Sequence, residues 1–73
     1  MNNKADLRMR LGRRIRHLRS QKGYSQEKLA QKVGIHRTYM GVIERGEKNI
    51  TIATAALIAD ALEISLAELF QGI

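Results

Sequence analysis

A sharp turn between two short helical patterns constrains this chain more than any other feature. Residues 25–33 and residues 36–45 each place apolar side chains at helical spacing, and Gly34 lies between them. Glycine readily adopts the left-handed conformation that a chain needs when it turns abruptly after a helix. Ala30 is small at a point where two helices must approach closely. We therefore expect two short helices that pack against each other across a tight turn.

A helical wheel divides the second of these helices into an outer and an inner face. The outer face is mostly polar and is free to meet a partner, while the inner face is apolar and joins the core. Tyr39 borders the inner face. The outer face holds Arg37, Thr38, Gly41, Val42 and Arg45, and the inner face holds Met40 and Ile43.

Three further helices are predicted around this pair. The first follows from an apolar stripe with spacings of four, four and three residues. Thr51 is placed to cap the second, and Ser65 with Glu68 forms a capping box at the third. We expect one all-α domain over residues 1–73. The stripe consists of Leu7, Leu11, Ile15 and Leu18, and the predicted ranges are 5–22, 25–33, 36–45, 51–62 and 65–71.

The helix predicted over residues 51–62 is apolar nearly all round. A helix without a polar face needs apolar cover on both sides. In so small a domain we expect the second cover to be another copy of the chain, in a two-fold dimer. The alternative is that the last helix folds back over Leu57. The inner face comprises Ile52, Ala55, Ala59 and Leu62, and the candidate dimer interface comprises Leu57, Ala61, Ile64 and Phe70.

Charge is divided unevenly along the chain. The net charge is +6, but residues 1–50 carry all 13 lysines and arginines and a net charge of +9, whereas residues 51–73 carry −3. A basic surface attracts polyanions, because lysine and arginine contacts to phosphates release condensed counterions. A surface that only keeps the chain soluble is the alternative. Composition therefore favours a nucleic acid as the partner.

Composition also argues against several classes of function. The chain has no cysteine, which removes thiolate metal ligands and disulfides, and we expect a cytoplasmic setting. No apolar run approaches the roughly 20 residues of a membrane span, so no membrane partner is expected. His17 and His36, the two histidines, have no cysteine or paired carboxylate at the spacing of a metal or catalytic site. We expect no enzyme activity, metal, cofactor or small-molecule ligand.

Residues 11–70 resemble the lambda Cro and repressor-type helix-turn-helix family. The resemblance rests on the turn glycine, the core pattern and the ending I-E-R-G at residues 43–46. Within that family, residues 36–52 resemble the controller proteins of restriction-modification systems. They read H-R-T-Y-M-G-V-I-E-R-G-E-K-N-I-T-I. The resemblance implies a five-helix bundle, the fold of a lambda repressor-like DNA-binding domain. Small members of the family bind palindromic operators as homodimers. One departure is Glu63, which stands where glycine often ends the fourth helix.

The resemblance assigns roles to the outer face. Arg37 and Thr38 match positions that read bases, and an arginine can bond guanine O6 and N7 together. Gln26 matches a glutamine that hydrogen-bonds a phosphate, and a helix start presents free N–H groups to an anion. Tyr39 matches a DNA-contacting position, although the wheel equally permits a half-buried ring. Base contacts are expected from Arg37, Thr38, Tyr39, Gly41 and Val42, and phosphate contacts from Gln26, His36, Arg45, Lys48 and Asn49.

Glu44 is the conspicuous acid in this basic region, where it would repel DNA if it faced the groove. We therefore expect it to face inward. By the resemblance its partner is Arg19 of the first helix, in an ion pair that braces the two helices.

The sequence thus predicts a sequence-specific regulator of transcription that binds double-stranded DNA as a homodimer, in the manner of an autoregulating controller protein. Whether it represses or activates depends on where the operator lies relative to the promoter, and RNA polymerase is a further candidate partner. The alternative is an antitoxin that binds a toxin protein and its own promoter. Neighbouring genes would separate the two, because a methyltransferase and endonuclease pair favours the controller and a small toxin gene favours the antitoxin.

Overall fold

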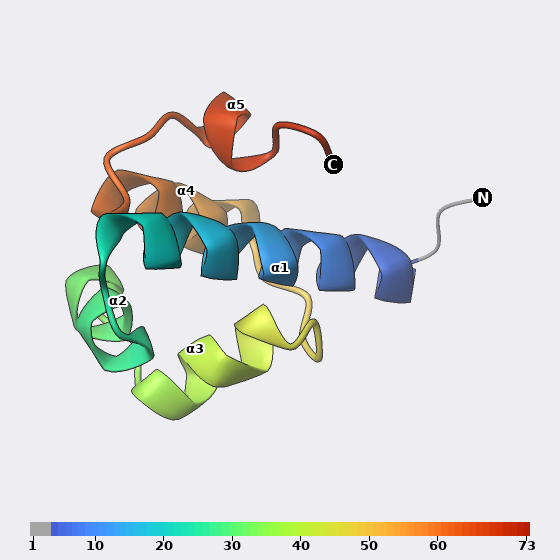
Figure 1. Ribbon diagram of the computed structural model, residues 1–73. Helices are drawn as coiled ribbons and strands as arrows, with labels where there is room; N and C mark the ends of the chain where they lie inside the picture. The colour runs from blue at the N-terminus through green and yellow to red at the C-terminus, as the bar shows by residue number, and fades with distance from the viewer. Residues whose placement is uncertain (1–3) are drawn as a thin grey trace.

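The computed structural model of the chain describes residues 4–73, in which it shows five α-helices and no strand (Figure 1). The all-α prediction is confirmed. The first three residues of the predicted domain lie outside this range. The helices are α1 (Lys4–Lys22), α2 (Gln26–Val33), α3 (Arg37–Glu44), α4 (Ile52–Ala61) and α5 (Leu66–Leu69).

The helix ends follow from capping residues. Four of the predicted ranges begin one residue early, because their first residue is an N-cap whose side chain accepts a backbone N–H. At α5 the predicted capping box is present: Ser65 Oγ accepts the Glu68 N–H at 3.0 Å, and Glu68 Oε1 accepts the Ser65 N–H at 3.0 Å. α5 ends before its predicted end, with Phe70 as its C-cap. The four N-caps are Ser25, His36, Thr51 and Ser65.

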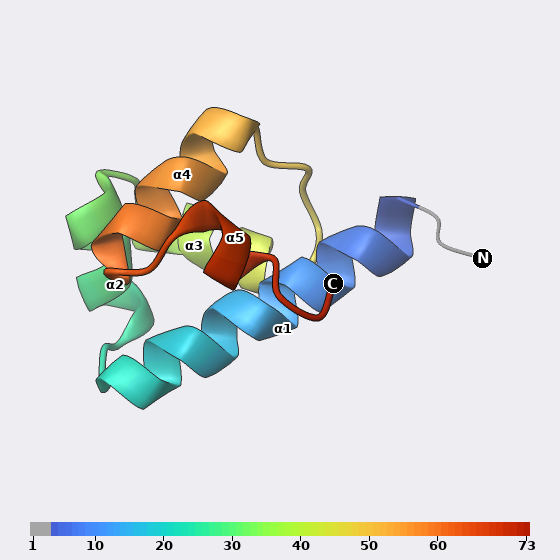
Figure 2. The ribbon, with the colours of Figure 1, turned by 90° about the horizontal axis from the view of Figure 1, so that it is seen from above.

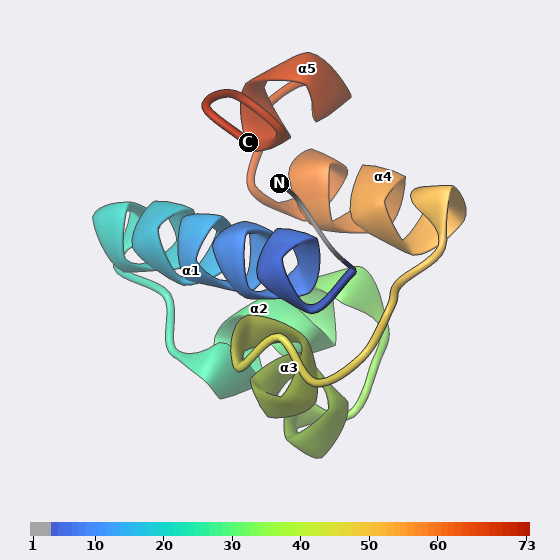
Figure 3. The ribbon, with the colours of Figure 1, turned by 90° about the vertical axis from the view of Figure 1, so that its right-hand side faces the viewer.

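In Figure 1 α1 runs across the middle of the view, with α2 and α3 below it and α4 and α5 above it. Direct packing joins α3 to both α1 and α2, and α4 to both α2 and α5. Figure 2 and Figure 3 show α5 lying over α1 and α4, on the side away from α3. This arrangement leaves the outer face of α3 uncovered by any other helix of the described chain.

The core lies where these helices meet, and it corrects two predicted positions. Leu7 is 47% exposed and Ile52 is 68% exposed, although both were expected to face inward. Leu7 lies in the first turn of α1, which extends beyond the body in Figure 1, and Ile52 is the first residue of α4. The buried apolar residues are Ile15, Leu29, Ala30, Val33, Met40, Ile43, Ala55, Ile58, Ala59, Leu62 and Leu69.

Gly12 allows α1 to approach the end of α3 very closely. A Cβ atom added to Gly12 would lie 2.5 Å from the Glu44 carbonyl oxygen and 2.7 Å from the Ile43 carbonyl oxygen. No side chain fits at that distance, so only glycine permits this crossing. α3 is therefore supported from behind by the backbone of α1.

Two arginines of α1 hold the C-terminal segment. Arg10 Nη2 donates to the carbonyl oxygens of Gly72 at 3.0 Å and Ile73 at 3.1 Å, and Arg14 Nη2 donates to the Glu68 carbonyl at 2.8 Å. These contacts tie α5 and the residues that follow it to α1. In residues 4–73, none of the helices combines the length and hydropathy required to span a membrane.

Candidate DNA interface

The first turn of α3 presents two exposed polar side chains, Arg37 and Thr38. The turn begins at His36, whose Nδ1 accepts the Thr38 backbone N–H at 3.0 Å. An imidazole nitrogen that accepts a hydrogen bond carries no proton, so His36 caps α3 in a form with Nδ1 unprotonated. The histidine therefore fixes the start of the helix that carries both base-reading candidates.

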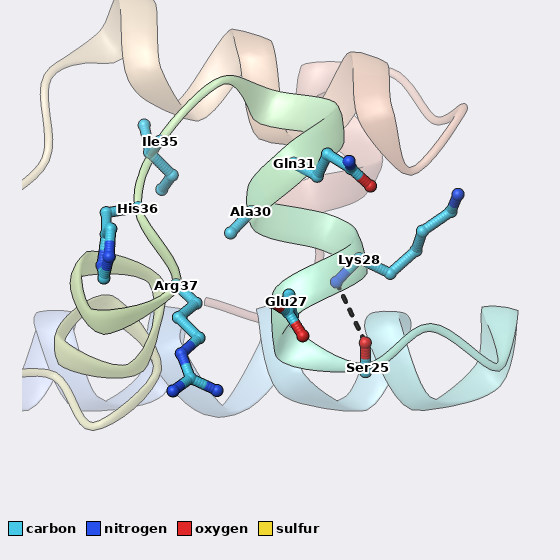
Figure 4. A pocket seen from close by; sticks show the side chains of 8 residues that line it. All are labelled: Ser25, Glu27, Lys28, Ala30, Gln31, Ile35, His36 and Arg37. Atoms are coloured by element: carbon cyan, nitrogen blue, oxygen red, sulfur yellow. Dashed lines mark hydrogen bonds between the residues drawn. The ribbon is translucent and has the colours of Figure 1, made fainter.

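An open groove of about 500 Å³ separates the N-terminal turns of α2 and α3 (Figure 4). Arg37 reaches toward it from α3, and Glu27 faces it from α2. At its edge the Ser25 hydroxyl accepts the Lys28 backbone N–H at 3.0 Å. Glu27, Lys28 and Gln31 were not among the predicted site residues, although their places on α2 could have revealed them. The lining residues are Ser25, Glu27, Lys28, Ala30, Gln31, Ile35, His36 and Arg37.

Behind this surface, Glu44 and Arg19 form the predicted ion pair. Arg19 Nε donates to Glu44 Oε2 at 2.7 Å and Arg19 Nη2 donates to Glu44 Oε1 at 3.1 Å, so the pair is bidentate. Arg19 Nη1 also donates to the Tyr24 carbonyl at 2.8 Å. The Glu44 side chain is 2% exposed, so its charge is buried, and Arg19 donates to both of its carboxylate oxygens. The pair joins α1, the turn before α2, and α3.

Gln26 is half-buried at the start of α2 and contacts the same carboxylate. Its Nε2 donates to Glu44 Oε1 at 3.0 Å. This contact was not predicted, because the resemblance gives Gln26 and Glu44 separate roles. The structure thus brings a predicted phosphate ligand and a predicted structural acid together.

The far end of α3 carries the remaining predicted phosphate ligands. Arg45 is exposed and pairs with Glu47, with Arg45 Nε at 3.1 Å from Glu47 Oε2. Lys48 and Asn49 are exposed in the loop that follows. An exposed pair of this kind contributes little free energy, so Arg45 is readily released to another anion.

Gly41 does not lie on the surface as predicted. It is buried, because it has no side chain of its own and the side chains of Arg45 and Gln26 lie over it. A Cβ atom at this position would lie 3.0 Å from Arg45 Nη1 and 3.5 Å from Gln26 Oε1. The expected exposure of Gly41 is therefore wrong, and a base contact there stays a prediction. The glycine instead makes room for two polar side chains.

The other two predicted base contacts are partly covered. Tyr39 is half-buried and packs against the core, as the wheel allowed, and Val42 is also half-buried. Among the predicted dimer residues, Leu57 is 52% exposed and is not covered by α5. The other three, which are half-buried and pack against the core of their own chain, are Ala61, Ile64 and Phe70.

The chemistry of this surface is that of hydrogen bonding and charge. Guanidinium, hydroxyl and carboxamide groups project from α2, α3 and the loop after α3, where they match base edges and phosphates. Within residues 4–73, histidine and acidic side chains do not gather in the groups of three or more that a metal ion requires.

Comparison with known proteins agrees with this geometry. The model of the helix-turn-helix family matches residues 15–69. Control protein C.SmaI of Serratia marcescens is 41% identical over 70 residues, which cover 93% of this chain and 83% of that protein. The crystal structure of the restriction-modification controller protein C.AhdI from Aeromonas hydrophila superposes with a TM-score of 0.85 at 45% identity, covering 90% of this chain and 98% of that one.

A further similar structure contains a ligand. SinR, a master regulator for biofilm formation, has been solved in complex with DNA, and it superposes with a TM-score of 0.77 at 34% identity, covering 84% of this chain and 98% of that one. The residues that the family model matches, 15–69, include α2 and α3 in full. This chain belongs to the helix-turn-helix family, in which restriction-modification controller proteins are among its relatives.

Proposed function

We propose that this chain is a sequence-specific transcription regulator that binds double-stranded DNA through α3. The observation that carries the proposal is the exposed first turn of α3, where Arg37 and Thr38 are exposed and Arg37 lines the groove beside the start of α2. In helix-turn-helix proteins the second helix of the motif enters the major groove with its first residues against base edges. Arg37 reads guanine in this arrangement, and Thr38 contacts a neighbouring base.

Phosphate contacts come from both ends of this surface. Gln26 begins α2, where free backbone N–H groups favour an anion, and Arg45, Lys48 and Asn49 follow the end of α3. His36 lies between the two helices and offers its second ring nitrogen to a phosphate of the DNA backbone. These contacts set the position of the chain on the duplex, and α3 supplies the sequence preference. The chain acts by binding and without catalysis, in the cytoplasm.

The active species in this proposal is a two-fold dimer. α4 leaves Leu57 52% exposed, and a second copy would cover it together with the exposed parts of Ala61, Ile64 and Phe70. A two-fold dimer places its two α3 helices on successive turns of one face of DNA, so the operator is a palindrome with half-sites about 34 Å apart.

We infer further that the chain regulates its own promoter, as a controller protein of a restriction-modification system would. Its relatives are control proteins and transcription regulators, which favours this function over the antitoxin alternative. Occupancy then follows the concentration of the dimer, and RNA polymerase becomes a partner where the operator lies beside the promoter.

Footprinting of the DNA upstream of the chain's own gene tests this function. The experiment uses physiological salt and excess competitor DNA, because phosphate contacts alone produce salt-dependent binding to any sequence. We expect protection of a palindrome with half-sites one helical turn apart. Diffuse binding that competitor DNA abolishes would contradict sequence-specific autoregulation.

The dimer is tested by Leu57→Glu, which places a charge on the proposed interface. We expect a monomer in sedimentation equilibrium and loss of cooperative operator binding, while the helical content is retained because Leu57 is not part of the core. Ile52→Glu is the matched control, since Ile52 is also exposed and lies on a different face of α4. Equal effects of the two substitutions would refute the interface.

A further inference from the structure

The Glu44 carboxylate accepts hydrogen bonds from two side chains that lie in different parts of the fold. Arg19 lies inside the fold and contacts both oxygens, whereas Gln26 is half-buried at the start of α2 and contacts only Oε1, at 3.0 Å. Glu44 is thus the point where the internal ion pair meets the surface that faces DNA.

The chemistry of this contact fixes the orientation of the Gln26 carboxamide. A carboxylate paired with an arginine is ionised and can only accept hydrogen bonds, so the group of Gln26 that faces it must be the NH₂. One N–H of that NH₂ is therefore committed to Glu44. The carbonyl oxygen Oε1 lies over Gly41, beside the Arg45 guanidinium. The second N–H is left for a ligand from outside.

We propose that Glu44 is a positioning residue for DNA binding, which holds the Gln26 carboxamide so that its second N–H faces the DNA backbone. The inference rests on the proposed function, in which Gln26 contacts a phosphate. Fixing a long side chain before binding removes part of the conformational entropy that the complex would otherwise lose. Arg19 neutralises the acid, so Glu44 orients Gln26 without repelling the phosphate.

This role explains why a buried acid lies directly behind a surface for a polyanion. An apolar pair of similar volume would brace α1 against α3 at least as well, because burying two charges costs about as much as their attraction returns. An apolar residue at position 44 would not, however, hold the amide of Gln26. Gly41 complements Glu44, since a larger residue there would crowd the Arg45 guanidinium and lie against Gln26 Oε1.

A double-mutant cycle tests the coupling. Wild type, Glu44→Gln, Gln26→Ala and the double mutant are titrated against a DNA duplex that the wild-type chain selects from a random pool, at a temperature where all four are folded. Gln26→Ala should weaken binding about tenfold, as loss of a hydrogen bond to a charged group does. Glu44→Gln should weaken binding about fivefold with Gln26 present and have no further effect without it.

The same cycle is run with Glu44→Asp, which keeps the charge for Arg19 but withdraws the carboxylate from Gln26, so the test stands where Glu44→Gln does not fold. Glu63→Gln is the matched control: it removes an acid from the Lys22–Glu63 pair, and its effect should be equal in both backgrounds. Equal losses for the Glu44 variants with and without Gln26 would overturn the positioning role. Failure of the wild-type chain to select any duplex would instead refute the proposed function.

Discussion

The two halves of the chain treat polar groups differently. Up to Gly46, the structure buries a charge. Glu44, counted as a whole residue, is 7% exposed, and it is the one charged residue that is buried in residues 4–73. From Thr51 onward the core is entirely apolar, and its polar side chains lie at helix caps or in solvent. In the first half, the bidentate ion pair fixes the angle between the Arg19 and Glu44 side chains as well as their distance. The second half supplies apolar stability and an exposed apolar face.

Two ion pairs differ in the same way: Arg19–Glu44 lies within the first half, and Lys22–Glu63 joins the first half to the second. Arg19 and Glu44 have side chains that are 13% and 2% exposed, whereas Lys22 and Glu63 are 36% and 72% exposed. Exposed pairs are screened by water and contribute little. Removing one member of a buried pair leaves a charge without a partner and is costly. Substitutions at Glu44 and Glu63 should therefore differ sharply in effect.

Glu44→Ala should have the largest effect on stability. It leaves the Arg19 guanidinium partly buried without its acid and should lower the free energy of unfolding by about 3 to 5 kcal/mol. Urea denaturation followed by circular dichroism measures the change, and folding should fail before base preference is altered.

Glu63→Ala is the control for the exposed pair and should leave the urea midpoint nearly unchanged. An unaltered melting temperature for Glu44→Ala would contradict the distinction between the two halves, since both acids would then act as surface charges.

Arg37→Ala comes next, and its effect falls on binding. It should cost about 1 to 3 kcal/mol on the selected operator and far less on random DNA, with the melting temperature unchanged, because the side chain is exposed and reads a base. Arg45→Ala is the matched comparison and should weaken binding to both DNAs alike, as a phosphate contact would. Equal losses for Arg37→Ala on the two DNAs would sink its base-reading role.

Much of the fold followed from local sequence signals. Periodicity and capping residues placed all five helices, and Gly34 takes the left-handed conformation with φ of 90° that the turn requires. The capping box of Ser65 and Glu68 was also readable, because both partners lie within one helical turn. Such features depend on neighbours in the sequence, so a single sequence is enough to predict them.

Contacts between distant elements were harder to predict. The wheel placed Gly41 on the outer face of α3, but it cannot show that the side chain of Gln26, from α2, lies over it. Gly12 gives no periodic signal either, although a glycine in mid-helix costs about 1 kcal/mol and so suggests a close approach. The sequence suggested separate roles for Gln26 and Glu44, and only the packing revealed that they share a hydrogen bond.

Gly41→Ala separates stability from function within the first half. Alanine in place of a mid-helix glycine should raise the free energy of unfolding by about 1 kcal/mol. Its Cβ would lie 3.0 Å from Arg45 Nη1, so the guanidinium must move from its place over α3. We expect a higher melting temperature together with weaker operator binding in a fluorescence anisotropy titration. A variant that is more stable and binds with unchanged affinity would show that the position of Arg45 does not matter.

The smallest effect concerns an acid of the second half. The Ser65 backbone N–H, which Glu68 accepts, holds the pKa of the Glu68 carboxyl below its ordinary value, and the Ser65 hydroxyl contact acts in the same direction. A lowered pKa in the folded state means that the carboxylate stabilises the fold above the ordinary pKa of glutamate, and that this contribution is lost as the pH falls through the lowered value.

Carboxyl NMR titration of Glu68 measures this shift directly, with the Ser65 amide proton as a second reporter of the same hydrogen bond. Glu68→Gln should abolish the titration of the Ser65 amide and leave the α3 region unaffected, since α5 lies on the opposite side of α1 (Figure 3). A Glu68 pKa at its ordinary value would mean that the capping box is open in solution. In that case the C-terminal segment would depend on Arg10 and Arg14 of α1 for its attachment, and on its apolar contacts.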